Sequence, residues 1–517
     1  MSVPPTSSTT ARRVRDRSTA PPAGVPTALF YAQRGNGQQC RPSRGGCAAS
    51  AHRRTARVPP GGMVPRGSVT GLAHLARRMF AAAVDAVRPA ALLRRVEALP
   101  DGVRFGDVAL RPAGRFVLVA LGKAAPGLAA SFLATTRRQP DTVFVLTPDG
   151  VAAPPSLAPH LRRAAHPTPD QRGVAATREL LALLAGLRAE DGVLLLLSGG
   201  ASALLAAPLP GVELGTVATL SRSLMHTGAP IRELNVVRKH LLAAAGGRLA
   251  ASCPAPVLAL VLSDVPGDDL SLIASGPTVA DPSTCSDALT VLARRGLLDA
   301  FPAVAAFLRE GGAESPKPGD PRLQRATTAL LGSSADALAA AGAVATEAGF
   351  RVVRLTRTLR GEAREVGRTL ATLARAAAGG DPVALLAAGE TTVHVVGAGC
   401  GGRNLELALA AAVELAGTDG ICLLAGGSDG VDGSSPAAGA VVDGSTVHRG
   451  ARRGLDALAR LHDNDSWGFF AGSDEAIVTG PTGTNVADVV FVLCAGAPVQ
   501  MLPTLLRDAP ALPRTLP

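Results

Sequence analysis

Residues 385–409 read LLAAGETTVHVVGAGCGGRNLELAL, and this stretch shows how the chain alternates between strand and helix. Two apolar runs, the second rich in β-branched residues, precede a glycine-rich turn that leads into an amphipathic run over 405–415. Such a turn predicts an anion site, because glycine lets backbone N–H groups approach the anion and the helix N-terminus carries partial positive charge. Arg403 adds a planar fork that suits a carboxylate or a phosphate. The candidate binding residues of this stretch are Glu390, Gly402, Arg403 and Asn404.

The same turn has the spacing of a dinucleotide-binding fingerprint, Gly397-x-Gly399-x-x-Gly402. That fingerprint needs an acidic residue about 20 positions further on, at the end of the next strand, to bind the ribose. Here Asp419 comes before the next apolar run and Asp429 comes too late. Because the chain contains 58 glycines, such spacing arises readily by chance, and a nicotinamide site is the weaker interpretation.

The composition sets the broad class of the protein. The chain has 517 residues, enough for two or three domains with a large apolar core. No uninterrupted apolar run reaches about 18 residues, so no membrane-spanning helix and no membrane partner are expected. The seven cysteines form no CxxC pair and the nine histidines show no ligand-type spacing. This argues against a disulfide framework or a zinc site, and favours a reducing, cytoplasmic location.

The net charge of +11 is concentrated at one end of the chain. Residues 1–69 hold eleven Arg, no Lys and one acid, Asp16, and so carry +10, which leaves +1 for the rest. The nearly neutral remainder gives no reason to expect nucleic-acid binding. The basic segment is rich in Pro, Gly, Ser and Thr without an apolar period, so it is expected to be a disordered tail or a mis-called start before Met63.

Lysine is rare in this chain: of 52 basic residues only Lys123, Lys239 and Lys317 are lysine. Where composition favours arginine, a retained lysine suggests a need for its compact charge. Lys123 follows Gly122 between an apolar run and a helical run, where its ammonium can meet an anion, although a surface turn is the alternative. Lys239 shares one side of a predicted helix with Asn235; ligand binding and a solvated face are equal alternatives there. Lys317 lies in a Pro-rich loop and is expected to be solvated.

From about residue 70, short apolar runs alternate with longer helical ones, which predicts βαβ units and mainly parallel sheets. The fold class is therefore α/β with two α/β domains, the first Rossmann-like with helices flanking its sheet and the second smaller and mixed. The predicted boundaries are 70–310 and 325–500 for the domains, 311–324 for a linker and 501–517 for a tail. The predicted strands are 115–121, 142–146, 193–197, 257–263, 351–355, 383–387, 393–396, 421–424 and 489–493. Helices are predicted over 71–87, 173–186 and 214–227, among others.

Polar turns follow several predicted strands, and in open parallel sheets ligands collect at the carboxyl ends of strands. The turn after 193–197 offers N–H groups and two hydroxyls to phosphate or carboxylate oxygens. A tight turn with a serine cap is the equal alternative. The candidate residues of this turn are Ser198, Gly199, Gly200 and Ser202.

Acidic turns follow two further predicted strands. Asp264, Asp268 and Asp269 repel one another unless they are solvated, paired or bound to a metal such as Mg2+. An Asx-turn cluster is the alternative. Asp429 lies in a similar turn after the strand at 421–424, and a hydroxyl-rich turn at 479–485 precedes the last strand. Several anion-friendly turns and two acidic ones in one α/β chain suggest a nucleotide-phosphate site.

In order along the chain, these segments resemble the class II glycerate kinases, which have an amino-terminal α/β domain and a carboxy-terminal domain called MOFRL. The match runs from about residue 72 to 496. It rests on LGKAAPGLA, HPTPD, LSGGASALL, GAPIRELNVVRKHL, LVLSDVPGDDLSLIASGPTVADPST, GETTVHVVGAGCGGRNLELAL, GGSDGVDGSSPAAGAVVDG and IVTGPTGTNVADV.

The resemblance implies ATP-dependent phosphorylation of D-glycerate to 2-phosphoglycerate, with a divalent metal, in a cleft between the two domains. The key lysine and arginine of the family correspond to Lys123 and Arg403. We expect these two cations to converge on glycerate and the transferred phosphoryl group, Asp264 or Asp268 to hold Mg2+, and Asp429 to take the hydroxyl proton. The rival interpretations are an oxidoreductase acting on hydroxypyruvate and a non-catalytic ligand-binding homologue. The oligomeric state, including a homodimer, stays open at this stage.

Overall fold

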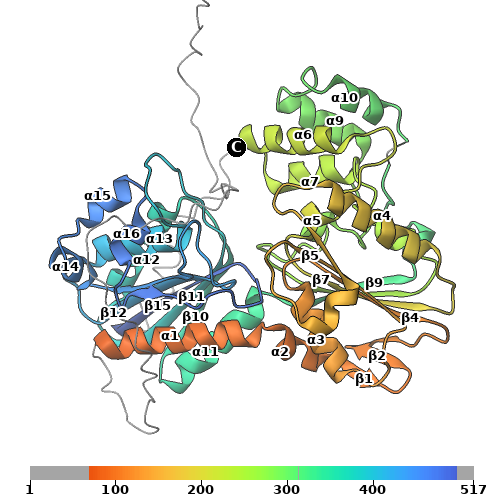
Figure 1. Cartoon of the computed structure of the whole chain (residues 1–517). Helices are drawn as coiled ribbons and strands as arrows, with labels where there is room; N and C mark the ends of the chain where they lie inside the picture. The colour runs from red at the N-terminus through yellow and green to blue at the C-terminus, as the bar shows by residue number, and fades with distance from the viewer. Residues whose placement is uncertain (1–68, 313, 498–517) are drawn as a thin grey trace, which may run out of the picture.

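The computed structural model describes residues 69–312 and 314–497, which form two α/β units lying side by side (Figure 1). The predicted tails lie outside the described residues, apart from Val69. Each unit is built on a six-stranded sheet, and a three-stranded sheet lies beside the first. The predicted α/β class with two units is confirmed. Within the described ranges, no helix has both the length and the apolar character needed to cross a membrane.

The sheet of the first unit is wholly parallel, in the order β6-β5-β4-β7-β8-β9. Its central strands are buried along their whole length, which explains why they read as continuous apolar runs rather than as alternating ones. Four of the six strands were predicted to within two residues. The strands are β4 (Phe116–Leu121), β5 (Thr142–Pro148), β6 (Leu161–Ala164), β7 (Gly192–Leu197), β8 (Val257–Leu262) and β9 (Ala326–Gly332).

Helices cover both faces of this sheet, and four of them form a separate layer with its own apolar core above its upper end (Figure 1). The four are α6 (Leu214–His226), α7 (Ile231–Lys239), α9 (Cys285–Arg294) and α10 (Pro302–Arg309). The flanking helices are α2 (Pro89–Leu92), α3 (Ala125–Thr135), α4 (Gln171–Ala185), α5 (Ala201–Leu204) and α8 (Arg248–Ala251). The small sheet consists of β1 (Glu97–Leu99), β2 (Gly102–Phe105) and β3 (Val108–Leu110), and short 3-10 turns lie at Leu93–Arg95, Pro155–His160, Ile273–Ser275 and Pro321–Leu323.

The sheet of the second unit is mixed, in the order β10-β11-β15-β12-β13-β14. β10 is parallel to β11, whereas β15 runs antiparallel to both of its neighbours. The strands are β10 (Arg351–Leu359), β11 (Asp381–Gly389), β12 (Ile421–Gly427), β13 (Gly439–Asp443), β14 (Ala476–Ile477) and β15 (Asp488–Ala497). The helices after α11 (Ser334–Glu347) are α12 (Ala363–Ala377), α13 (Arg403–Leu415), α14 (Thr446–Ala451), α15 (Ala457–His462) and α16 (Ser466–Phe470).

The first described helix, α1 (Val69–Ala86), packs on the second sheet beside α11, although the first unit follows it in sequence (Figure 1). Met79 and Phe80 of α1 share one buried core with Leu424 and Phe491 of the second sheet. At the other crossing, β9 follows the predicted linker yet pairs with β8 in the first sheet. The chain therefore passes between the units twice, at points that the predicted boundaries do not mark.

One local expectation is wrong, and a second needs detail. Residues 393–396 form no strand; only a single bridge, between Glu362 and Thr392, lies nearby. The backbone N–H of Val396 instead donates to Asn464 Oδ1 at 2.8 Å, so a side chain takes the place of a strand neighbour. Lys317 is not a free solvated side chain either, because its ammonium lies 2.6 Å from Glu314 Oε2.

Candidate active site

The first unit contributes residues at the carboxyl ends of three adjacent parallel strands. β4 ends at Leu121, directly before Gly122 and Lys123, and β7 ends directly before Ser198. β8 ends shortly before Asp264. Since β4, β7 and β8 are neighbours in that sheet, these turns lie at one edge, as expected for a ligand site in a parallel sheet.

The second unit contributes acidic residues through its strand register. Asp488, the first residue of β15, pairs with Gly389 at the end of β11 and with Gly427 at the end of β12. Because β15 runs antiparallel to both, its start meets their ends. Glu390 and Asp429, which follow those ends, therefore lie at the same sheet edge as Asp488.

Arg403 is held between two of these carboxylates. It is the first residue of α13, and its Nη2 donates to Asp488 Oδ1 at 3.0 Å while its Nη1 lies 2.8 Å from Glu390 Oε1. Burial alone lowers the pKa of Arg403, but Asp488 and Glu390 outweigh burial and raise it. The guanidinium is therefore fully charged and has a fixed orientation.

Lys123 approaches the same group from the first unit. Among the described residues, its ammonium has no carboxylate within ion-pair distance and no hydrogen-bond partner. Burial raises the pKa values of Asp429 and Glu390, whereas Lys123 and Arg403 both lower them. Both cations therefore lie within electrostatic range of the same two carboxylates. The structure thus brings together Lys123, Arg403, Asp429 and Glu390.

Asp264 also belongs to this group, and a side chain from the second unit contacts it. Asn485 Nδ2 donates to Asp264 Oδ2 at 3.3 Å. Burial raises the pKa of Asp264 and Asp429 raises it further, whereas Lys123 lowers it. Paired, desolvated carboxylates of this kind suit a divalent cation.

Asp268 does not extend this carboxylate pair. Its Oδ2 accepts a hydrogen bond from Arg357 Nη1 at 2.7 Å, which links the two units beside the site. An arginine therefore pairs with Asp268, and its role as a metal ligand stays a prediction.

The turn after β7 is built closely around the candidate site. Ser198 Oγ donates to Leu121 O at 3.1 Å and accepts from Ala124 N at 3.0 Å, so this hydroxyl holds the neighbouring turn rather than a ligand. A Cβ on Gly199 would lie 1.7 Å from Asp264 Oδ2, so only glycine allows that carboxylate to pack there. Gly200, at a φ of +84°, has both Lys123 and His166 beside it.

A second row of polar side chains supports this turn. Ser202 Oγ lies 3.2 Å from Ser275 Oγ, and Ser275 Oγ donates to Asn235 Oδ1 at 2.7 Å. Asn235 Nδ2 in turn lies 3.4 Å from Leu272 O. The predicted residues Ser202 and Asn235 are thus joined through a third residue that had no predicted role.

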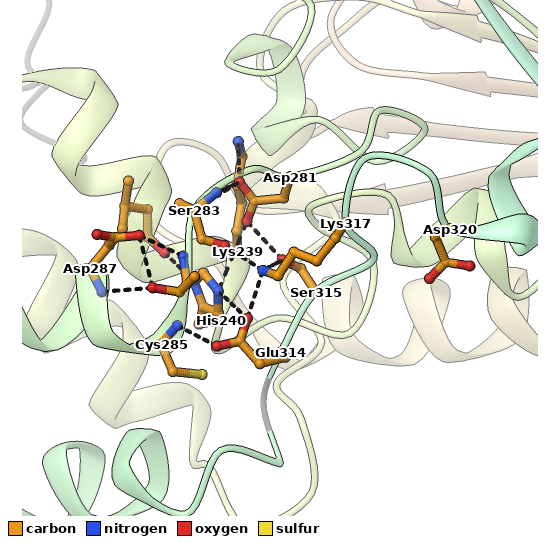
Figure 2. Close-up of polar contacts among 12 residues, drawn as sticks. Lys239, His240, Asp281, Ser283, Cys285, Asp287, Glu314, Ser315, Lys317 and Asp320 are labelled. Carbon is orange, nitrogen blue, oxygen red and sulfur yellow. Dashed lines mark hydrogen bonds and ion pairs between the residues drawn. The ribbon is translucent and has the colours of Figure 1, made fainter.

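Lys239 has a different environment from the one expected. Its ammonium lies 3.2 Å from Asp281 Oδ1, and both side chains are almost fully buried. Figure 2 shows this pair within a polar cluster around His240 and Glu314. A buried carboxylate thus pairs with the ammonium of Lys239, and its role in substrate binding stays a prediction.

The start of α13 also differs from the expected anion site. Asp432 accepts hydrogen bonds from the backbone N–H of Asn404 at 3.1 Å and of Leu405 at 2.8 Å, so the chain supplies its own anion there. A Cβ on Gly397 would lie 2.2 Å from Asp463 O, and one on Gly402 would lie 2.3 Å from the Asp432 carboxyl carbon. These glycines therefore allow close packing against Asp463 and Asp432, and the binding of an anion by this loop stays a prediction.

Sequence reasoning missed several residues of the site. Burial first, and then Lys123, lower the pKa of His166 to about 4, so its imidazole is neutral beside the ammonium. Burial raises the pKa of Asp432 to about 7. The HPTPD, GSDGVDG and TGTNVAD segments drew attention to the turns that hold His166, Asp432 and Asn485. The last of these segments ends at Asp488, but nothing in it marked Asp488 as a partner of Arg403.

The fold and this site define a two-unit α/β protein that gathers two cations and several carboxylates where the ends of two sheets meet. Residues 75–309 match a family described as a domain of unknown function, DUF4147, and residues 383–488 match the MOFRL family. The chain belongs to the glycerate kinase family that combines these two domains. This confirms the resemblance seen in the sequence.

Similar proteins cover most of the chain. A D-glycerate 2-kinase from Thermotoga maritima is 41% identical over 385 residues, which span 73% of this chain and 90% of that protein. A putative hydroxypyruvate reductase from Agrobacterium vitis is 40% identical over 425 residues, 81% of this chain and 93% of that protein. The crystal structure of a glycerate kinase from Thermotoga maritima superposes with a TM-score of 0.72 at 38% identity, covering 82% of this chain and 100% of that one.

Proposed function

We propose that this protein is an ATP-dependent kinase that phosphorylates D-glycerate at its 2-hydroxyl, giving 2-phosphoglycerate. The observation that carries the proposal is that the two units meet at this site. Asn485 of the second unit contacts Asp264 at 3.3 Å, beside the turn that packs against Lys123, and Arg403 is paired with Glu390 and Asp488. The kinase names of relatives that span most of the chain support it.

Phosphoryl transfer depends mainly on positioning and charge neutralisation. Lys123 has no carboxylate partner of its own among residues 69–312 and 314–497, so its ammonium is free to pair with an anionic substrate group. Three N–H groups of Arg403 contact Asp488 and Glu390. The remaining two of its five N–H groups can bind phosphoryl or carboxylate oxygens. Asp429, whose pKa is raised by burial, is placed to accept the proton of the substrate hydroxyl.

The residues present fit a divalent cation such as Mg2+. Asp264 supplies a half-buried carboxylate near Asp429, and Mg2+ is commonly held by one or two carboxylates together with substrate phosphates. Asp264 would hold the ion, which would neutralise phosphate charge. Asn485 orients Asp264 through its amide.

A reductase acting on hydroxypyruvate is the rival function, and one relative carries that name. The dinucleotide-like glycines Gly397, Gly399 and Gly402 pack closely against Asp463, Asp465 and Asp432 of the chain itself, which favours a packing role for them over a dinucleotide site. Incubation with NADH and hydroxypyruvate, followed by absorbance, tests this alternative. Oxidation of NADH at a rate above that of D-glycerate phosphorylation would favour the reductase.

The kinase is tested with Lys123→Ala and Arg403→Ala, assayed with ATP, Mg2+ and D-glycerate. Each substitution removes charge that stabilises the transferring phosphoryl group, so kcat should fall by about 10²–10³-fold, or about 3–4 kcal/mol of barrier. Arg375→Ala, which breaks a solvent-exposed pair with Glu414, is the matched control and should keep wild-type rates. Near wild-type rates for both test variants would remove the proposal, and phosphorus NMR of the product identifies the hydroxyl.

A further inference from the structure

A compact group of metal-ligand atoms lies outside the candidate active site, in the four-helix layer of the first unit. His240 Nε2, Cys285 Sγ and a carboxylate oxygen of Glu314 all lie within 4.8 Å of one another. Figure 2 shows the three side chains converging from the end of α7, the start of α9 and the segment before Lys317. We propose that His240, Cys285 and Glu314 bind a borderline-soft divalent metal ion, Zn2+, at a structural site.

The first argument is the hydrogen bonding of the two ring nitrogens of His240. Its Nδ1 lies 2.8 Å from Val236 O, and since a carbonyl only accepts, Nδ1 carries the proton. The other ring nitrogen, Nε2, faces the cluster and has no hydrogen-bond partner there, although the side chain is fully buried. A buried polar atom without a partner is costly. Metal-bound histidines characteristically donate their other ring N–H to a carbonyl in this way.

A proton on Nε2 would not find a well-placed hydrogen-bond acceptor in the cluster. The nearest acceptors would be Glu314 Oε2 at 3.5 Å and Asp281 Oδ2 at 4.0 Å, longer than the roughly 2.7–2.9 Å of a charge-assisted hydrogen bond. Ligand bonds of about 2.0–2.1 Å in a tetrahedral arrangement place a nitrogen and an oxygen ligand roughly 3.4 Å apart. The separation between His240 Nε2 and Glu314 Oε2 therefore matches two ligands of one metal ion better than a donor and an acceptor.

The donor set selects the kind of metal. Imidazole, thiol and carboxylate together suit Zn2+, whereas Mg2+ and Ca2+ prefer oxygen ligands alone. Cys285 is buried and is the first residue of α9. Burial, and then Glu314, raise the pKa of the Cys285 thiol to about 11, so metal binding must displace its proton.

Supporting contacts hold the carboxylate ligand in place. Glu314 Oε1 accepts the backbone N–H of Cys285 at 2.7 Å, which leaves Oε2 facing His240. Ligating carboxylates commonly have such a second hydrogen bond. Asp281 lies behind the site and is neutralised by Lys239 at 3.2 Å.

Two other cations face the cluster. Lys317 Nζ lies 2.6 Å from Glu314 Oε2 and 3.0 Å from Ser315 Oγ, and it also contacts Ser283 O. Arg248 Nη1 donates to the backbone carbonyl of Glu314 at 2.9 Å. Lys317 therefore competes with the metal for Glu314, but it is partly exposed and keeps its other two partners when the metal binds.

A metal here would fasten three segments that are far apart in sequence. It would join the end of α7 to the first residue of α9 and to the segment that leads into β9. Because α7 also carries Asn235, whose side chain reaches Ser202 through Ser275, the metal would steady one wall of the candidate active site. Its role is structural, so the site does not depend on the proposed kinase reaction.

The test uses the full chain, stripped with a chelator and then titrated with Zn2+ or Co2+. We expect one zinc ion bound with Cys285 as ligand, and a cobalt form with a thiolate-to-metal charge-transfer band in the near ultraviolet. Cys285→Ser should abolish that band and this zinc ion. Cys253→Ser, which removes a buried thiol that donates to Ala255 O, is the matched control and should change neither.

Two further variants keep the proposal falsifiable if Cys285→Ser folds poorly. Glu314→Gln should weaken zinc binding at least tenfold, because loss of a supporting group alone commonly costs 10–100-fold. Lys317→Met should tighten binding, because it removes the cation that competes for Glu314. The proposal is overturned if the cobalt band is absent, if it survives Cys285→Ser, or if the zinc content of wild type and Glu314→Gln is equal.

Discussion

Lys123 and Arg403 carry the same charge in opposite surroundings. Arg403 is held by Asp488 and Glu390, so its orientation is set before any ligand arrives. Lys123 has no such partner within the described residues and can adjust to the ligand. The sequence pointed to Lys123 by its rarity and to Arg403 by its place at a helix start. The segment TGTNVAD contains Asp488 but did not mark it as a partner of Arg403, because that contact arises only through strand pairing.

Asp488→Asn should therefore act through Arg403. The variant keeps the size of the side chain but removes the charge that orients the guanidinium, so kcat with ATP and D-glycerate should fall by up to about 10²-fold. The folded state should survive, as judged by circular dichroism. Asp101→Asn, in an exposed pair with Arg111, should retain full activity. An Asp488→Asn enzyme as fast as wild type would show that the orientation of Arg403 is not limiting.

The pH dependence should follow Asp429. Burial, with a further contribution from Asp488, raises the pKa of Asp429 above its ordinary value. A base is lost when it is protonated, so kcat/KM should fall as pH drops through this raised pKa rather than through the usual range of aspartate. Asp429→Asn should lower kcat by about 10²–10⁴-fold and remove this acid limb. If the acid limb of the pH profile is unchanged in Asp429→Asn, the titrating group is a residue other than Asp429.

Among the elements, the positions of the β-strands could be predicted from the sequence, whereas the contacts made by the turns and helix starts could not. Buried parallel strands such as β4 and β7 read directly as apolar runs. Residues 393–396 have the same β-branched character but form no strand, because Asn464, far away in sequence, takes the N–H groups of Val396 and Gly397. The start of α13 is likewise decided by Asp432 from a later loop.

The contact between α1 and β12 gives a prediction about stability. Phe80 of α1 is buried, and a Cβ on Gly426 of β12 would lie 2.7 Å from its ring. Phe80→Ala leaves a cavity between helix and sheet, so the free energy of unfolding should fall by about 3–5 kcal/mol in urea titration. Leu458→Ala, at a side chain that is 59% exposed, should change it little. Equal urea midpoints of unfolding for the two variants would contradict this account of the packing.

In the whole molecule, the two units meet at the site through polar links and share one core. Asn485 reaches Asp264, and Arg357 reaches Asp268. One apolar core runs from α1 and the second sheet to α3 and β4 of the first unit. The elements that bring Lys123 near Arg403 are thus held both by apolar packing and by contacts at the edge of the site.

A fragment of residues 325–497, which follows the predicted domain boundary, should not fold well by itself. It lacks α1 and so exposes the apolar face on which Met79 and Phe80 pack. It should bind a hydrophobic dye and lack near-ultraviolet circular dichroism. Fusing residues 69–88 to this fragment through a flexible linker should restore order. A fragment that is monomeric and ordered without α1 would show that the helix is dispensable.

The sequence alone determined the α/β class, most strands of both sheets, and the turns that hold Lys123, Asp264, Asp429 and Arg403, because buried strands and strand-end turns leave local signals. Only the tertiary structure decided which of those side chains keep a free charge. Lys239 and Asp268 have partners 42 and 89 residues away, and the His240, Cys285 and Glu314 group has no spacing that a motif could capture. Charge neutralisation and metal coordination depend on distances of a few ångströms in space, and local sequence does not encode distances between segments that are far apart in the chain.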